Sequence, residues 1–177
     1  MRLFSAVDLD LEIKNYLNSL KFGNEYAKIN WVPKKNLHIT LKFFGDVSEN
    51  KISHLDSLLK VVKFDKFKLK LNSLGFFPNE DSPNVIWIGV EPHDKFIELQ
   101  KKIDEATLIF SEKAVKLGAH LTLGRIKSIK NKQQFIKLIK SMRIKPIEFN
   151  VTDFCLFKSK LTKDSPRYKL IKSYSLE

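Results

Sequence analysis

Apolar and polar residues alternate along several short stretches of this chain, as they do in strands that bury one face. The alternation and the flanking turn residues predict strands over 2–7, 28–32, 37–44, 67–74, 119–127, 146–157 and 168–176. Residues 85–90 are apolar throughout, which predicts a strand buried on both faces. Other stretches repeat apolar residues at steps of three and four, which predicts helices near 9–20, 48–62, 94–110 and 132–142.

The order of the predicted elements mixes strands and helices without a regular strand–helix–strand rhythm. Many strands are joined by links too short for a crossover helix, so we expect antiparallel pairing. No linker rich in Pro or Gly interrupts the chain, and 177 residues suffice for one core or for two small lobes packed as a unit. We therefore predict an α+β fold with antiparallel sheets, in which residues 1–177 form a single domain.

One of the alternating stretches contains a short motif that occurs a second time in the chain. His38-Ile39-Thr40-Leu41 is matched by His120-Leu121-Thr122-Leu123, and these two histidines are half of the four in the chain. Ordinary residue usage makes such a coincidence rare. The repeat indicates two related lobes that each contribute one motif strand, with both histidines lining a shared cleft if the lobes face each other.

Strand geometry decides which side chains face that cleft, because successive side chains point to opposite faces. In the first motif, strict alternation places His38, Thr40 and Lys42 on one face. The other face then carries the apolar residues Leu37, Ile39, Leu41 and Phe43. In the second motif the same rule turns Arg125 away from the cleft, and a bulge at Gly124 would bring it back. Lys42 and Arg125 are therefore candidate contacts to a phosphate.

Each motif sets a hydroxyl two residues after an imidazole. An unperturbed imidazole, with a pKa near 6.5, gains or loses a proton around neutral pH, and a hydroxyl can donate to a bound anion. Two such units across a cleft would supply one acid, one base and two hydroxyls that hold an anion, from the set His38, Thr40, His120 and Thr122. The pattern alone does not assign which histidine is the acid.

Other chemistries fit the sequence less well. Neither motif carries a further His, Cys, Asp or Glu at metal-ligand spacing. The chain also lacks the Gly-x-Ser-x-Gly elbow of serine hydrolases and the glycine-rich loops that bind nucleotide phosphates. We therefore expect neither a metal nor another cofactor.

The formal net charge of +12 favours a polyanionic partner such as RNA. The basic residues are 28 Lys and 4 Arg, and a Lys-rich, well-solvated surface can also reflect a general compositional bias, so both interpretations stay open. Cys155 is the only cysteine, which favours a reducing interior. Residues 1–9 are too short an apolar run for a signal peptide, and no run is long enough to span a membrane. We expect a cytoplasmic protein.

These motifs resemble those of the 2H phosphoesterase superfamily, and within it the RNA 2′,3′-cyclic phosphodiesterases often labelled 2′-5′ RNA ligases. The two His-x-Thr-x motifs match at His38 and His120, and the resemblance covers essentially the whole chain. It includes Arg2-Leu3-Phe4, Asn36-Leu37, Lys42-Phe43 with Gly45, Phe77-Pro78-Asn79, Trp87 with Gly89-Val90, and Pro166 with Tyr168. The chain departs from the family at Ala119, where Pro is frequent, and at Gly124, where Ala is common.

The resemblance implies a two-lobed fold whose two antiparallel sheets face a central cleft, with helices on the outer faces. It implies an enzyme that hydrolyses the 2′,3′-cyclic phosphodiester end of an RNA to a 2′-phosphomonoester without a metal. In that mechanism His120 accepts a proton from water, His38 donates a proton to the departing 3′ oxygen, and Thr40 and Thr122 hold the phosphoryl oxygens. The expected partner is an RNA with such an end, tRNA fragments included, and the expected state is a monomer.

Two alternatives use the same motifs. RNA 2′-5′ ligation is the reverse of the hydrolysis, and a noncatalytic RNA-binding module would use the histidines only to contact phosphate. Turnover of a 2′,3′-cyclic end would exclude the binding module. Comparison of hydrolysis and ligation rates would separate the two enzymatic alternatives.

Overall fold

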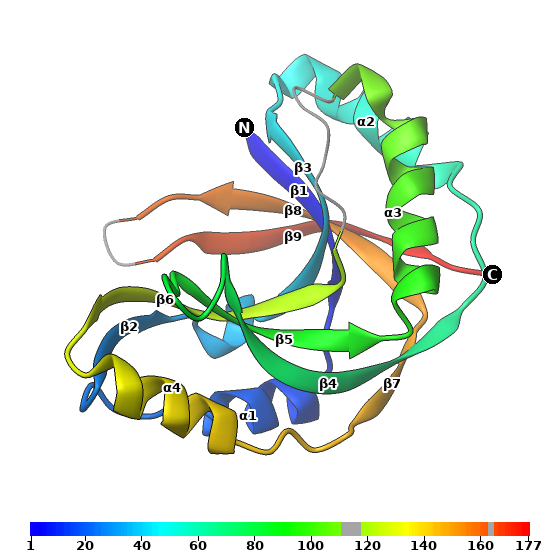
Figure 1. The fold of residues 1–177 in the computed structure, drawn as a ribbon. Helices are drawn as coiled ribbons and strands as arrows, with labels where there is room; N and C mark the ends of the chain where they lie inside the picture. The colour runs from blue at the N-terminus through cyan, green and yellow to red at the C-terminus, as the bar shows by residue number, and fades with distance from the viewer. Residues whose placement is uncertain (111–117, 163–164) are drawn as a thin grey trace.

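The computed structural model describes residues 1–110, 118–162 and 165–177 (Figure 1). Within these ranges the chain forms nine strands and four α-helices. The strands are β1 (Arg2–Asp8), β2 (Ala27–Trp31), β3 (His38–Asp46), β4 (Phe67–Phe77), β5 (Val85–Glu91), β6 (His120–Ile129), β7 (Glu148–Val151), β8 (Asp153–Lys160) and β9 (Arg167–Ser175). The helices are α1 (Leu11–Ser19), α2 (Glu49–Lys60), α3 (His93–Ala106) and α4 (Lys132–Ser141). Among the described helices, none is long and apolar enough to span a membrane.

All the described strands belong to one curved sheet with the order β7-β4-β5-β6-β3-β1-β8-β9, and β2 pairs with β6 off this path. The pairings are antiparallel, which confirms the predicted α+β class. Within the described residues, β3 and β6 are paired at one position, Ile39 with Leu121. This pairing joins the half that contains β1, β3, β8 and β9 to the half that contains β4, β5, β6 and β7, so the two expected sheets meet at the motif strands.

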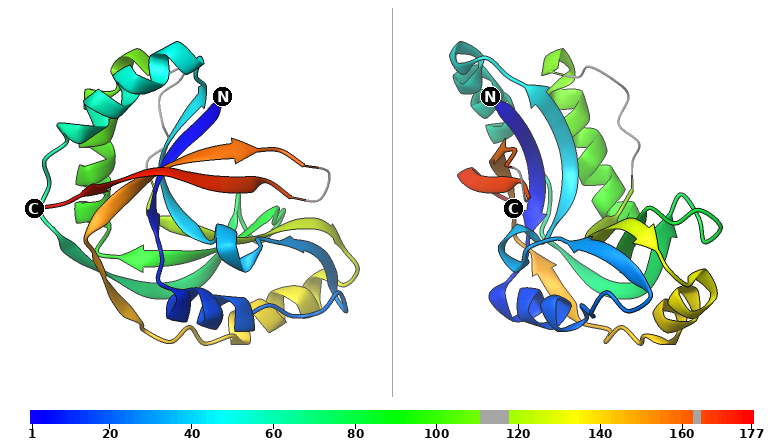
Figure 2. Two further views of the ribbon diagram at one scale, coloured as in Figure 1. Left: turned by 180° about the vertical axis from the view of Figure 1, so that it is seen from behind. Right: turned by 90° about the vertical axis from the view of Figure 1, so that its left-hand side faces the viewer.

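The helices cover the two ends of the curved sheet. Helices α2 and α3 lie at one end, and α1 and α4 lie at the other (Figures 1 and 2). Their buried apolar residues belong to the same core cluster as the inward residues of the motif strands, a cluster that includes Ile13, Leu55, Leu99, Ile139, Ile39, Leu41, Leu121 and Leu123. The core therefore fixes the position of both motif strands from behind.

A bulge interrupts the regular alternation of β3 just after the first motif. Ser5 of β1 pairs with Lys42 and Ala6 pairs with Thr40, which leaves Leu41 without a partner in β1. A bulge of this kind reverses the face on which the following side chains lie. The predicted phase is therefore wrong beyond Leu41: Lys42 is buried, with 1% of its surface exposed, and Phe43 is 66% exposed.

A bulge occurs at the corresponding place in β6. Thr122 pairs with Trp87 of β5 and Gly124 pairs with Ile86, which leaves Leu123 without a partner in β5. The two motif strands therefore share the same irregularity, one residue after the Thr of each motif. Because the two bulges fall at matching positions, Lys42 in β3 corresponds to Gly124 in β6, and Phe43 corresponds to Arg125.

Some predicted boundaries also change. The strand expected over 146–157 is two strands, because β7 pairs with β4 while β8, beginning at Asp153, pairs with β1. The helix expected to end near residue 110 ends at Ala106 and is followed by a 3-10 turn over Leu108–Phe110. The strand over 85–90, expected to be buried on both faces, is only partly buried at Val85 and Trp87.

Candidate active site

The first motif, the second motif and the start of β9 meet at a cavity of about 210 Å³. Its lining includes His38, Thr40, Thr122 and Arg125 among the predicted site residues, together with Tyr168, but it does not include His120. The end of β2 and the two residues after it complete the wall with residues 30–33. The structure therefore brings together side chains from positions that lie far apart in the sequence.

The register of β3 and β6 sets how the motif side chains face one another. Because Ile39 lies opposite Leu121 in an antiparallel pair, the residues on either side of Ile39 adjoin those on either side of Leu121. His38 therefore neighbours Thr122, and Thr40 neighbours His120, on the face opposite the core. The register therefore sets the two motifs next to each other, while the hydroxyl that contacts the His38 ring is that of Thr40 in its own motif.

Two hydrogen bonds fix the ring of His38. Its Nδ1 lies 2.7 Å from the carbonyl oxygen of Asn36, which can only accept, so Nδ1 carries a proton and donates. Its Nε2 lies 3.0 Å from Thr40 Oγ1 and accepts from that hydroxyl when the ring is neutral. Burial lowers the pKa of His38, and the bond to Asn36 opposes this by favouring the charged ring. Nε2 is thus the nitrogen free to exchange a proton.

His120 is held by aromatic packing. Its ring makes edge contacts with Phe77, at 4.9 Å between centroids, and with Trp87, at 6.4 Å. No hydrogen bond joins the ring to any residue in the ranges that the structure describes. Burial lowers the pKa of His120, so the neutral form, which can accept a proton, is favoured. The two histidines therefore differ in their surroundings although their motifs match.

Arg125 lies at the cavity, as a bulge in β6 would require. The bulge falls at Leu123, one residue before the predicted Gly124. Gly124 has its own packing role, because a Cβ there would lie 2.8 Å from both Ile29 and Trp31 of β2. Those two side chains explain why this chain departs from the common Ala at this position.

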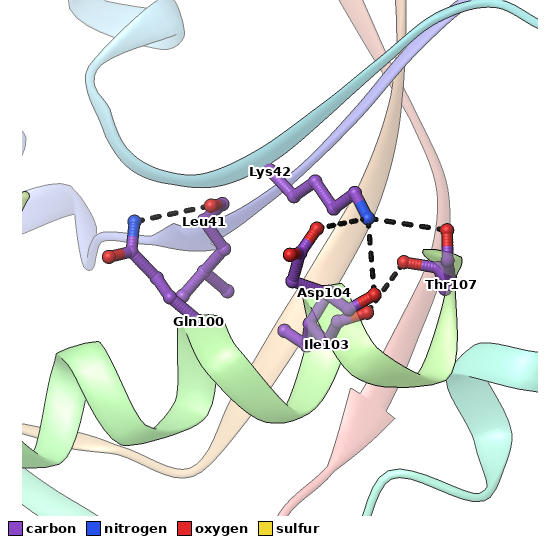
Figure 3. Close-up of polar contacts among 6 residues, drawn as sticks. All are labelled: Leu41, Lys42, Gln100, Ile103, Asp104 and Thr107. Carbon is purple, nitrogen blue, oxygen red and sulfur yellow. Dashed lines mark hydrogen bonds and ion pairs between the residues drawn. The ribbon is translucent and has the colours of Figure 1, made fainter. Parts of the chain in front are cut away.

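Lys42 does not reach the cavity, which corrects its prediction as a phosphate contact. Its Nζ donates to Asp104 Oδ1 at 2.5 Å and to the Thr107 carbonyl oxygen at 3.2 Å, both near the C-terminal end of α3 (Figure 3). The ammonium also lies 5.7 Å from the centroid of the Phe44 ring. A cation is favoured beside the free carbonyls of a helix C-terminus. Lys42 therefore anchors β3 to α3 on the core side of the sheet.

The sequence pattern predicts no site role for Tyr168, Asn36 or Phe43. The Tyr168 ring lies edge-on to His38, at 5.3 Å between centroids. Burial raises the pKa of Tyr168, and the neighbouring charge of Arg125 opposes the rise. Asn36 accepts from His38 through its backbone and donates from its side-chain Nδ2 to the Pro166 carbonyl oxygen at 2.6 Å. Asn36 thereby ties the start of the first motif to the segment before β9.

Phe43 lines the cavity because of the bulge at Leu41, which no pattern of apolar residues could indicate. Asn36 and Tyr168 did carry a signal, since both belong to the segments that resemble the 2H superfamily. In the described ranges, no group of three or more His, Cys, Asp or Glu side chains is arranged to hold a metal ion.

Comparison with known proteins gives consistent results for the whole chain. The family model "LigT like Phosphoesterase" matches residues 7–87 and, a second time, residues 88–168, so each match contains one motif. The RNA 2′,3′-cyclic phosphodiesterase of Methanocaldococcus jannaschii is 36% identical, and the alignment covers 98% of this chain and all of that protein. The protein of the same name from Thermotoga maritima is 34% identical, over 97% of this chain and 93% of the relative.

Solved structures agree with these relatives. A crystal structure of a protein from Thermus thermophilus superposes with a TM-score of 0.79 at 26% identity and covers 99% of this chain and 97% of that one. The crystal structure of E. coli LigT complexed with 3′-AMP gives a TM-score of 0.75 at 26% identity, with the same shares of the two chains covered.

The fold and the paired His-x-Thr motifs define a phosphoesterase of the 2H class. The chain belongs to the LigT-like phosphoesterase family. The resemblance seen in the sequence is therefore confirmed, as is the expectation that the chain is an enzyme.

Proposed function

We propose that this enzyme hydrolyses the 2′,3′-cyclic phosphodiester end of an RNA to a 2′-phosphomonoester, with two histidines as acid and base and without a metal. The pairing of Ile39 with Leu121 supports the proposal, because it sets the two motifs side by side, with His38, Thr40 and Thr122 lining one cavity. The printed names of the relatives, RNA 2′,3′-cyclic phosphodiesterases, support the substrate class.

In the proposed reaction, neutral His120 takes a proton from a water molecule, whose oxygen attacks phosphorus. The bond from phosphorus to the 3′ oxygen breaks, and protonated His38 donates the proton of Nε2 to that oxygen. Burial lowers the pKa of both rings, which suits His120 as the base; at His38 the Asn36 carbonyl opposes the lowering, and we assign the acid role to His38 for that reason. The hydroxyls of Thr40 and Thr122 donate to the phosphoryl oxygens, where charge accumulates.

Arg125 adds a positive charge at the same cavity, and we propose that it binds the phosphate or the adjoining nucleotide. Fragments of tRNA with cyclic ends are candidate substrates. We expect the chain to act as a monomer with one motif in each of its two lobes. Cys155 is buried and has no disulfide partner in this sequence, which suits the reducing cytoplasm.

The test is incubation of the purified protein, with a chelator present, with a short RNA that ends in a 2′,3′-cyclic phosphate. We expect full turnover to a 2′-phosphate, and a loss of at least about 100-fold in kcat/KM for His38→Ala and for His120→Ala. His54→Ala and His93→Ala are matched controls, because both side chains are exposed and lie on α2 and at the start of α3. Loss of turnover in chelator, or a 3′-phosphate product, would contradict the proposed mechanism.

A further inference from the structure

Helix α3 carries one polar side chain within its buried apolar face. Gln100 is 3% exposed and lies among the buried residues Phe96, Leu99 and Ile103. A primary amide buried in this way destabilises the fold unless its donors and its acceptor find partners. The partners of Gln100 are all backbone groups, and they belong to the first motif strand and to the segment that enters the second.

On one side, Gln100 serves the bulge of the first motif. Its Nε2 donates to the Leu41 carbonyl oxygen at 3.2 Å and to the Thr40 carbonyl oxygen at 3.3 Å (the Leu41 bond is drawn in Figure 3). Leu41 is the residue that the bulge leaves without a partner in β1. The amide therefore supplies the hydrogen bond that the irregular strand lacks, directly behind the hydroxyl of Thr40.

On the other side, Gln100 reaches the entry to the second motif. Its Oε1 accepts from the backbone N–H of Gly118 at 3.2 Å. Gly118 lies against His120, because a Cβ at Gly118 would be 3.4 Å from Nδ1 of that ring. The amide is thus hydrogen-bonded to the Thr40 backbone, and through Gly118 it is linked to the imidazole of His120.

The direct link between the two motif strands is weak, since β3 and β6 share one pairing in the described residues. We infer that Gln100 is a positioning residue that sets the two motif strands relative to each other and so fixes the distance between His38 and His120. It touches neither histidine, so it acts through the Thr40–Leu41 backbone and through Gly118. The expected effect of this role on turnover rests on the proposed function.

The test compares Gln100→Met, which keeps the length of the side chain but removes its donors and its acceptor, with the wild-type protein. We expect kcat on the cyclic RNA end to fall by about 10- to 100-fold with KM changed by less than about threefold, because small misplacements of catalytic groups cost rate. Ile103→Val on the same face of α3 is the matched control for a loss of stability without loss of these bonds. Gln133→Met, at an exposed position on α4, controls for the chemistry of the substitution.

A second readout does not depend on turnover. The chain has four histidines, so each ring Cε1–H signal can be followed by NMR during a pH titration. In Gln100→Met we expect the signals of His38 and His120 to move while those of His54 and His93 stay. His93 begins α3, and the His54 ring lies 6.0 Å from Phe110 beyond that helix, so general loosening of α3 would move them too.

Gln100→Glu separates the two links and serves if the Met variant does not fold. Its carboxylate keeps an oxygen that accepts from Gly118 but has no donor for the carbonyl oxygens of Thr40 and Leu41, so the His38 signal should move more than that of His120. Unchanged signals of both histidines with normal kcat would overturn the role of Gln100, and so would equal movement of all four signals. Absence of turnover in the wild-type protein would instead contradict the proposed function, while the NMR comparison would still decide the role of Gln100.

Discussion

Substitution of Lys42 by Met tests whether this residue holds α3 or binds substrate. Met fills similar volume but cannot replace the bonds from Nζ to Asp104 Oδ1 at 2.5 Å and to the Thr107 carbonyl at 3.2 Å. Removal of one partner from a fully buried ion pair costs about 3–5 kcal/mol. The Asp104 side chain is 32% exposed and can regain water, which reduces the expected loss to about 2 kcal/mol.

A loss of that size should lower Tm by about 4–8 °C in a chain of 177 residues. The assay combines thermal unfolding followed by circular dichroism with steady-state kinetics on a cyclic RNA end. We expect the KM of Lys42→Met to stay within about twofold of the wild-type value, because Nζ faces away from the cavity. Lys101→Met, at an exposed position of α3, is the control and should change neither quantity.

Arg125→Met gives the opposite pattern, with Tm nearly unchanged and KM raised by about 10-fold or more, since a charge-assisted hydrogen bond contributes about 1.5–3 kcal/mol. The reasoning would be refuted if Lys42→Met raised KM as Arg125→Met does while Tm stayed constant. That result would mean that the ammonium leaves α3 and contacts the substrate.

Other predictions concern the cavity and its walls. Burial lowers the pKa of His38 and His120, so below about pH 6.5 the unfolded chain binds more protons than the folded one and the protein loses stability. The urea midpoint should therefore decrease as the pH is lowered from 7.5 to 5.5. His38→Gln should make this decrease smaller, and an unchanged decrease would contradict the explanation. Tyr168→Ala should raise KM by up to about 10-fold, whereas Tyr168→Phe, which keeps the ring against His38, should leave KM unchanged. Equal kinetics of the two variants would argue against a role for the contact between the Tyr168 ring and His38. Gly124→Ala should lower the free energy of unfolding by about 1–3 kcal/mol, measured by urea titration, and the loss should be smaller in an Ile29→Ala background, which lacks the Cγ2 methyl that the new Cβ would meet.

The sequence predicted most of the elements and the paired motifs because both depend on local patterns. The period of apolar residues located the strands and helices, and the recurrence of His-x-Thr identified the two motifs, of which His38, Thr40 and Thr122 line the cavity. Thr40 and Thr122 could be placed because each lies two residues after its histidine, before any irregularity in the strand.

Lys42 and Phe43 could not be placed, because a bulge is decided by the neighbouring strand. Ser5 and Ala6 of β1 pair on either side of Leu41, and one unpaired residue reverses the side chains that follow it, here up to the second irregularity at Phe44. The role of Asn36 also depends on contacts distant in sequence, since its side chain reaches Pro166. Such pairings are properties of the assembled sheet and leave no periodic signal in either segment.

The matching bulges at Leu41 and Leu123 bear on how the enzyme tells one side of its substrate from the other. Two strands that present His and Thr in the same order, related by an antiparallel pairing, form an approximately twofold-symmetric set of donors and acceptors. A symmetric set binds a cyclic phosphate equally well in two orientations, and these orientations would cleave different ester bonds. We expect the choice to come from the groups that break the symmetry, which include the different surroundings of the two histidines and, at the cavity, Phe43 on one strand and Arg125 on the other. We therefore predict that the regiochemistry of cleavage depends on the residues just beyond the motifs, and that exchange of those two side chains would shift it.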